Sequence, residues 1–116
     1  MVFHLTDAQG AVLLQRRPPE GLLGGMTEMP GTPWRDAIWS DNDALALAPI
    51  PAEWRSAGAV RHVFTHFALT LDVKQARCAV VPAETLVGRF LCPADALAGQ
   101  ALPTLMRKAL AVAGPA

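Results

Sequence analysis

The chain has 116 residues and a mass of 12.3 kDa, enough for one domain with its own hydrophobic core. Hydrophobic residues make up 52% of the chain, and 21 of them are alanine. Charged residues make up 17%, so the composition excludes a disordered chain. The net charge of zero argues against an autonomous nucleic-acid binder, but not against a domain that covers nucleic acid held by another protein. No apolar stretch reaches 18 residues and no signal peptide is present, so we expect no membrane partner and a cytoplasmic location.

The amino-terminal third predicts a β-hairpin followed by a shaped loop. Residues 2–6 and 11–17 predict two strands, and the cluster at residues 7–10 predicts the turn between them. Eight glycines and prolines between Pro18 and Pro33 exclude a helix there and leave room only for a short strand at residues 26–29. Because this loop is rich in apolar residues, we expect it to pack on the body of the domain.

The rest of the chain predicts a short helix, a long strand signal and a terminal helix. N-caps at residues 41–43 predict a helix over residues 44–48. Alternation from Ala59 to Ala79 predicts β-structure too long for one strand, with a break at Thr65–His66. One helical turn is predicted at residues 93–97. The last helix has an apolar face consisting of Leu102, Leu105, Met106, Ala109, Leu110 and Ala113.

Other residues of chemical interest favour structural roles. The cysteines Cys78 and Cys92 make no metal motif and predict two small core residues rather than a disulfide. Arg107 and Lys108 lie off the apolar face of the last helix, and Arg16–Arg17 end a predicted strand. For both pairs, solvated charges are favoured over phosphate contacts.

Three segments resemble one known family, in the same order along the chain. Residues 13–31 (LLQRRPPEGLLGGMTEMPG) resemble the opening of the C-terminal domain of the MutY family of A/G-specific adenine DNA glycosylases. Residues 60–67 (VRHVFTHF) are similar to that family's second signature, a Phe-Ser-His loop, and residues 102–108 are similar to its closing helix. The resemblance implies an α+β, Nudix-like fold, in which a mixed β-sheet is flanked by helices.

The catalytic motif of Nudix hydrolases, G-x5-E-x7-R-E-U-x-E-E-x-G-U, fits the sequence in no register. Counted from Gly31, its first glutamate falls on Ala37; counted from Gly21, it falls on Thr27. Because Mg²⁺ needs clustered oxygen ligands, the sequence argues against Nudix hydrolysis. The nearby carboxylates are interpreted as surface charges: Glu20, Glu28 and Asp36.

In the MutY family, the catalytic Glu and Asp and a four-cysteine iron–sulfur cluster lie in an amino-terminal helical domain. This chain has two cysteines and no helix-hairpin-helix pattern, so residues 1–116 are expected to form a single recognition domain with no cofactor of its own. We expect either that this chain is a fragment excised from a glycosylase or that the catalytic part is a separate chain. Met1, at the in-phase start of the first strand, suggests a cloned domain boundary. The implied partners are that catalytic domain and damaged duplex DNA with an 8-oxoguanine:adenine mispair, in a nucleoid-associated location.

The resemblance implies that the domain senses the base opposite the adenine to be removed. Thr65 stands at the family's serine position, and its hydroxyl can donate to O8 and accept from N7–H of 8-oxoguanine. Phe64 is predicted either to wedge beside the base or to be a core aromatic residue. His66 is predicted to contact a phosphate or a base edge, with a plain turn histidine as the alternative. For Arg61 and His62, a backbone-phosphate contact and an exposed strand charge remain equally open.

These observations together predict the 8-oxoguanine recognition domain of an adenine DNA glycosylase in base excision repair, without catalytic activity of its own. Two alternatives stay open. One is a Nudix-type hydrolase of nucleoside diphosphate derivatives with a displaced metal site. The other is a protein-interaction module built on a catalytically inactive Nudix scaffold.

Overall fold

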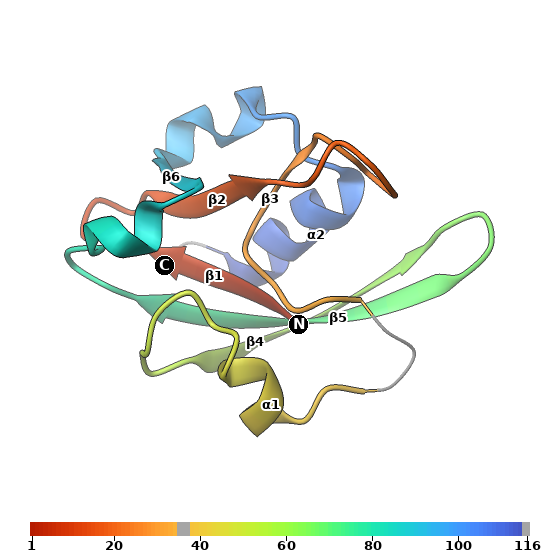
Figure 1. Cartoon of the computed structure of the whole chain (residues 1–116), viewed down its shortest axis with the longest axis horizontal. Coiled ribbons are helices and arrows are strands. Elements are labelled where there is room, and N and C mark those ends of the chain that lie inside the picture. The colour runs from red at the N-terminus through yellow and green to blue at the C-terminus, as the bar shows by residue number, and fades with distance from the viewer. Residues whose placement is uncertain (35–37, 115–116) are drawn as a thin grey trace.

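The computed structural model describes residues 1–34 and 38–114, which form a mixed β-sheet with helices on both faces (Figure 1). The sheet order is β3-β2-β1-β5-β4, and β6 also pairs with β2. β1 and β5 are parallel and the other pairs are antiparallel. The strands are β1 (Val2–Thr6), β2 (Val12–Arg16), β3 (Thr27–Glu28), β4 (Arg55–Val63), β5 (Ala68–Arg77) and β6 (Arg89–Cys92). The helices are α1 (Asp41–Leu45) and α2 (Thr104–Ala113), with 3₁₀ segments η1 (Ala83–Leu86) and η2 (Ala94–Gly99). The predicted α+β class and mixed sheet are confirmed.

The predicted amino-terminal hairpin exists at its turn, but its two strands diverge after one pair, Thr6 with Val12. Residues 27–32 enter the gap that opens between them. There β3 pairs with the end of β2, and Gly31 forms a bridge with Val2. Glycine is needed at this crossing, because a Cβ would lie 2.8 Å from the carbonyl oxygen of Met1.

The long strand signal is an antiparallel hairpin of β4 and β5, broken at Thr65–His66 as predicted. In Figure 1 this hairpin extends well beyond the rest of the sheet. A bulge at Gly58, where φ is +138°, bends β4 under α2. A Cβ at this position would lie 2.9 Å from Cγ1 of Val112, so the bulge brings the strand backbone into close contact with the helix.

Each face of the sheet carries an apolar core, because successive residues of a strand point to opposite faces. Val2 of β1 packs on the α2 side, whereas Phe3 and Leu5 pack on the side of α1 and Trp54. The predicted apolar face of the last helix is confirmed, with Leu110 half-buried and the others buried: Leu102, Leu105, Met106, Ala109 and Ala113. The free thiol of Cys92 is buried and that of Cys78 is half-buried, as predicted for small core residues.

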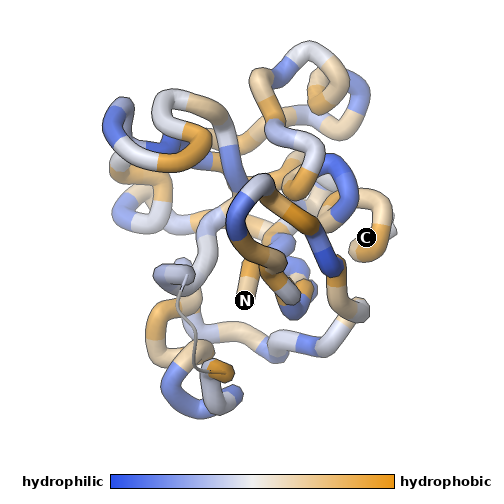
Figure 2. Tube along the Cα trace, turned by 90° about the vertical axis from the view of Figure 1, so that its right-hand side faces the viewer, coloured by the Kyte–Doolittle hydropathy of each residue, from blue (hydrophilic) through white to orange (hydrophobic). Residues whose placement is uncertain are grey.

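The helix boundaries and one strand differ from the prediction. The N-cap of α1 is Ser40, whose Oγ accepts from the backbone N of Asp43 at 3.2 Å, so the helix begins three residues before the predicted Ala44. The predicted turn at residues 93–97 is a 3₁₀ segment. Strand β6 was not predicted, since four residues between two 3₁₀ segments carry too short a pattern. Within residues 1–34 and 38–114, no helix is long and apolar enough to span a membrane, and Figure 2 shows apolar residues in short stretches along the trace.

Candidate nucleic-acid interface

The turn between β4 and β5 presents the residues singled out from the sequence. Phe64 N donates to the carbonyl oxygen of Phe67 at 2.7 Å, which closes a four-residue turn. Thr65 and His66 occupy the two central positions and are exposed. The backbone therefore holds the Thr65 hydroxyl and the His66 imidazole at the tip of a projecting hairpin, open to a ligand from outside.

Phe64 belongs to an aromatic cluster at the base of the turn. Its ring stacks on Phe67 with centroids 4.8 Å apart, meets the edge of His62 at 4.8 Å and lies 6.0 Å from Trp34. The Phe64 side chain is half-buried and packs against the main core. This packing is that of a core aromatic residue, one of the two roles predicted for Phe64, and the predicted contact with a base stays a prediction.

His62 and Arg61 are neighbours in sequence but point to opposite faces of the sheet. His62 lies on the Phe64 face, and its Nδ1 is 3.1 Å from Nζ of Lys108 on α2. Because an ammonium group only donates, Nδ1 of His62 is the acceptor in this contact. Arg61 is exposed on the other face. The structure therefore joins His62 to Phe64 and separates Arg61 from both.

Trp34 and Lys108 are members of this surface that the sequence did not single out as site residues. The guanidinium of Arg17 lies over the ring of Trp34, 4.5 Å from the ring centroid. Arg17 also donates to Glu28 at 2.9 Å and to the carbonyl of Leu22 at 3.1 Å. Arg17 is thus a fixed residue that ties the glycine-rich loop to β3, which corrects its interpretation as a solvated strand end. The apolar composition of residues 18–34 predicts that this loop packs on the body, which holds for Met29, 1% exposed, but not for Leu22, which is 42% exposed.

The chain matches the family model of the NUDIX domain over residues 1–112 and belongs to the NUDIX domain family. It is 36% identical over 80 residues to the human adenine DNA glycosylase, a match that covers 62% of this chain and 15% of that protein. The chain thus spans a small part of that relative's length.

Two solved structures share the fold. The C-terminal domain of mouse MUTYH, in its crystal complex with human PCNA, superposes with a TM-score of 0.76 at 27% identity, over 96% of this chain and 81% of that chain. A Nudix hydrolase from M. smegmatis, RenU, superposes with a TM-score of 0.57 at 23% identity, over 90% and 75% of the two chains, and shows the fold alone. The predicted resemblance to C-terminal domains of the MutY family and the Nudix-like fold are confirmed.

The carboxylates of residues 1–34 and 38–114 do not form the Mg²⁺ site of Nudix hydrolases. Glu28 accepts from Nε2 of Gln15 at 2.8 Å and from Arg17, so its carboxylate is half-buried and ion-paired, not the surface charge predicted. Glu20 is exposed, as predicted, and Asp36 lies outside the described residues. In the part of the chain that the structure describes, no three His, Cys, Asp or Glu side chains gather to hold a metal ion. Around the turn, the described side chains are aromatic, hydroxyl and cationic.

Proposed function

We propose that the chain acts in DNA repair as a recognition domain without a catalytic centre, which senses 8-oxoguanine opposite adenine in duplex DNA. The observation that carries the proposal is the exposed turn of Thr65 and His66 on a domain similar to the C-terminal domain of mouse MUTYH. The Thr65 hydroxyl supplies a donor for O8 and an acceptor for N7–H, the two groups that separate 8-oxoguanine from guanine. The catalytic step would belong to a helical glycosylase domain as partner.

The surroundings of the turn support this role. Lys108 lies beside His62 and supplies a positive charge on the same face, suited to a backbone phosphate. The aromatic cluster of Phe64, Phe67 and Trp34 gives the turn a rigid base. A rigid tip is what discrimination between two similar bases requires, because a misplaced hydroxyl loses its hydrogen bond.

The test is an NMR titration of the ¹⁵N-labelled chain with two duplexes that differ only in 8-oxoguanine or guanine opposite adenine. We expect amide shifts at residues 61–67 with both duplexes and tighter binding of the 8-oxoguanine duplex. Thr65→Val should abolish the difference, whereas Thr65→Ser should keep it. Thr104→Val, an exposed threonine on α2, serves as the matched control. Shifts confined to other surfaces, or equal affinities for the two duplexes, would contradict the proposal.

A protein-interaction role is the second candidate, favoured by one observation: the mouse relative was solved in complex with human PCNA. Under that role, the turn would bind a partner protein and the DNA titration would show no dependence on the lesion. The same labelled chain, titrated with a sliding-clamp protein, separates the two roles.

A further inference from the structure

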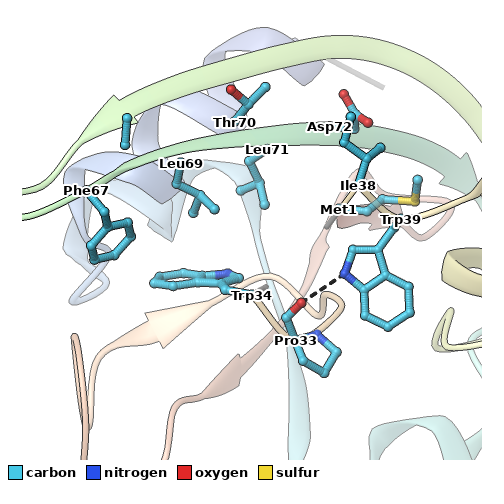
Figure 3. Close-up of a pocket in the computed structure, with 11 residues that line it drawn as sticks. Met1, Pro33, Trp34, Ile38, Trp39, Phe67, Leu69, Thr70, Leu71 and Asp72 are labelled. Atoms are coloured by element: carbon cyan, nitrogen blue, oxygen red, sulfur yellow. Dashed lines mark hydrogen bonds between the residues drawn. The ribbon is translucent and has the colours of Figure 1, made fainter. Parts of the chain in front are cut away.

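Trp34 follows the glycine-rich loop and packs against the start of the turn between β4 and β5. Its ring centroid lies 6.0 Å from that of Phe64, and the two ring planes are 36° apart. Figure 3 shows the Trp34 indole beneath β5, with Leu69 and Leu71 pointing toward it. Phe64 is the first residue of the turn, because its N donates to the carbonyl oxygen of Phe67. The position of the indole therefore bears directly on the residue with which the turn begins.

Arg17 is held by three contacts, one of them with the ring of Trp34. Its guanidinium lies 4.5 Å from the ring centroid. Nη1 donates to Oε1 of Glu28 at 2.9 Å, and Nε donates to the carbonyl oxygen of Leu22 at 3.1 Å. The side chains of Arg17 and Glu28 are only 21% and 13% exposed. Because the guanidinium is planar, the three contacts together fix both its position and the tilt of its plane.

Glu28 is fixed by a hydrogen-bond network that crosses three paired strands, β3, β2 and β6. Its Oε2 accepts from Nε2 of Gln15 at 2.8 Å, so each carboxylate oxygen has a donor of its own. Oε1 of Gln15 accepts from Nε of Arg89 at 3.1 Å, and Nη1 of Arg89 donates to the carbonyl oxygen of Thr85 at 3.1 Å. A carboxamide at position 28 would place an NH₂ group against one of the two donors. The network therefore requires a carboxylate at Glu28 and anchors Arg17 to the sheet.

We propose that Arg17 is a positioning residue for the turn between β4 and β5. It holds Trp34 against Phe64, which fixes the Thr65 hydroxyl at the tip of the turn, and Glu28 orients Arg17. The proposal rests on the proposed recognition of 8-oxoguanine by this turn. The Arg17 guanidinium acts through Trp34, and its charge is matched by Glu28 rather than by a phosphate of DNA. Arg17 should therefore affect the difference in affinity between two duplexes that differ in one base, because their phosphate contacts are the same.

The first measurement is made on the full chain without DNA. From ¹⁵N relaxation we expect backbone order parameters of about 0.85 at Thr65 and His66, the value of a rigid backbone. Arg17→Lys keeps the charge but loses the planar group, so both order parameters should fall toward about 0.6. Arg16→Lys is the matched control, because Arg16 is the exposed neighbour of Arg17 and should leave the turn ordered. A turn that stays ordered in Arg17→Lys overturns the proposal.

Trp34 supplies an independent pair of variants, which is needed if Arg17→Lys unfolds the domain. Trp34→Phe keeps an aromatic face and should keep the turn ordered, whereas Trp34→Leu keeps only an apolar side chain and should not. A melting curve for each variant separates local loss of order from unfolding. Equal order parameters in Trp34→Phe and Trp34→Leu would contradict the proposal.

The second measurement compares the Kd values for the duplexes with 8-oxoguanine and with guanine opposite adenine. Arg17→Lys should reduce their ratio about tenfold, the effect of one weakened hydrogen bond. The Kd for the guanine duplex should stay within about twofold, because the phosphate contacts are retained. Glu28→Gln should act like Arg17→Lys, and the double variant should lose no more discrimination than Arg17→Lys alone, because both changes break one series of contacts.

Failure of this proposal and failure of the proposed function give different results. If the unaltered chain prefers the 8-oxoguanine duplex and Arg17→Lys keeps that preference, the proposal for Arg17 is overturned and the proposed function stands. The proposal is also overturned if Arg17→Lys weakens binding of both duplexes equally, which would assign Arg17 a phosphate contact. If the unaltered chain binds both duplexes equally, the proposed function fails, and the order parameters alone decide whether Arg17 positions the turn.

Discussion

Nζ of Lys108 lies 3.1 Å from Nδ1 of His62, so the last helix places a cation beside the strand that leads into the turn of Thr65 and His66. These two residues are 46 positions apart. The sequence favoured a solvated charge for Lys108, and the fold brings it to the one face where His62 and Phe64 meet. Lys108 is therefore the first residue to test for a phosphate contact.

Binding of undamaged duplex should be weak, because a chain with no net charge releases few counterions. We expect a Kd no tighter than about 10⁻⁴–10⁻⁶ M at physiological salt. Lys108→Gln should reduce the slope of log K against log salt by about 1. Lys74→Gln is the matched control, because Nζ of Lys74 lies 3.5 Å from Asp41. Fluorescence anisotropy over a salt series measures both, and a submicromolar Kd would contradict the expectation.

Thr65→Val should act on discrimination when the chain is assembled with a catalytic domain. Loss of a hydrogen-bond partner costs about 1–3 kcal/mol, so the preference for adenine opposite 8-oxoguanine over adenine opposite guanine should fall about 10- to 100-fold. Thr65→Ser should retain the preference. Single-turnover excision on the two mispairs gives the answer, with a melting curve for each variant. An unchanged preference, or a loss explained by unfolding, would assign the hydroxyl a structural role.

The chain alone should neither hydrolyse nucleoside triphosphates nor release adenine. Glu28 is engaged by Arg17 and Gln15, and Glu20 is exposed away from any carboxylate cluster among the described residues. Phosphate release with Mg²⁺ and excision on a mispaired duplex are the two assays. Turnover above a blank that disappears in Glu20→Gln or Glu28→Gln would refute this prediction.

His4 should make the domain less stable in mild acid. Its side chain is 3% exposed, and burial lowers the pKa of the imidazole below its usual value of about 6.5. The unfolded chain therefore takes up a proton at a higher pH than the folded chain. Stability is full above the unfolded pKa and falls as the pH decreases toward the folded pKa, by up to about 1.4 kcal/mol per pH unit.

The measurement is denaturant unfolding between pH 5 and 8. His4→Leu should flatten the pH dependence, and His66→Leu, at an exposed position, should leave it unchanged. Equal slopes for His4→Leu and the parent would show that another group carries the effect.

Gly58→Ala should destabilise the fold by about 1–3 kcal/mol, since the residue has φ +138° and a Cβ would meet Val112 at 2.9 Å. Gly99→Ala is the control, because nothing lies within 4 Å of a Cβ there and the residue sits outside the left-handed region. We expect its effect to stay within about 0.5 kcal/mol. Thermal melts of the two variants measure the difference in stability, and an equal loss of stability in Gly58→Ala and Gly99→Ala would contradict the prediction.

The sequence predicted those features that depend on residues close together in the chain. The alternation along residues 68–73 and the apolar face of α2 are properties of single elements, and both were found as expected. Beyond Val73 the alternation of burial ends, and Ala76 is buried on the opposite face of the sheet. The start of α1 was misplaced because Ser40 competes with three other good N-caps that follow it. The exposed turn was predicted by strand length, although no glycine or proline marks it.

Contacts between distant segments could not be predicted. The stacking of Arg17 on Trp34 and the approach of Lys108 to His62 depend on how the loop and the last helix pack on the hairpin. Neither pair carries a pattern of its own. The divergence of β1 from β2 likewise depends on residues 27–32, whose glycine and proline predict a loop but not its path.

The position of β1 has a consequence for the order in which the domain assembles. Its parallel partners on β5 lie more than seventy positions further along the chain, from Val73 to Arg77, whereas β4 and β5 are joined by a short turn. Closing so large a loop is slow, so we expect the β4–β5 hairpin to form first and the amino-terminal strand to dock late. During synthesis, β1 cannot complete its pairing with β5 until about two thirds of the chain has been made. A break within residues 38–40 would therefore separate β1 and β2 from their partners β5 and β6.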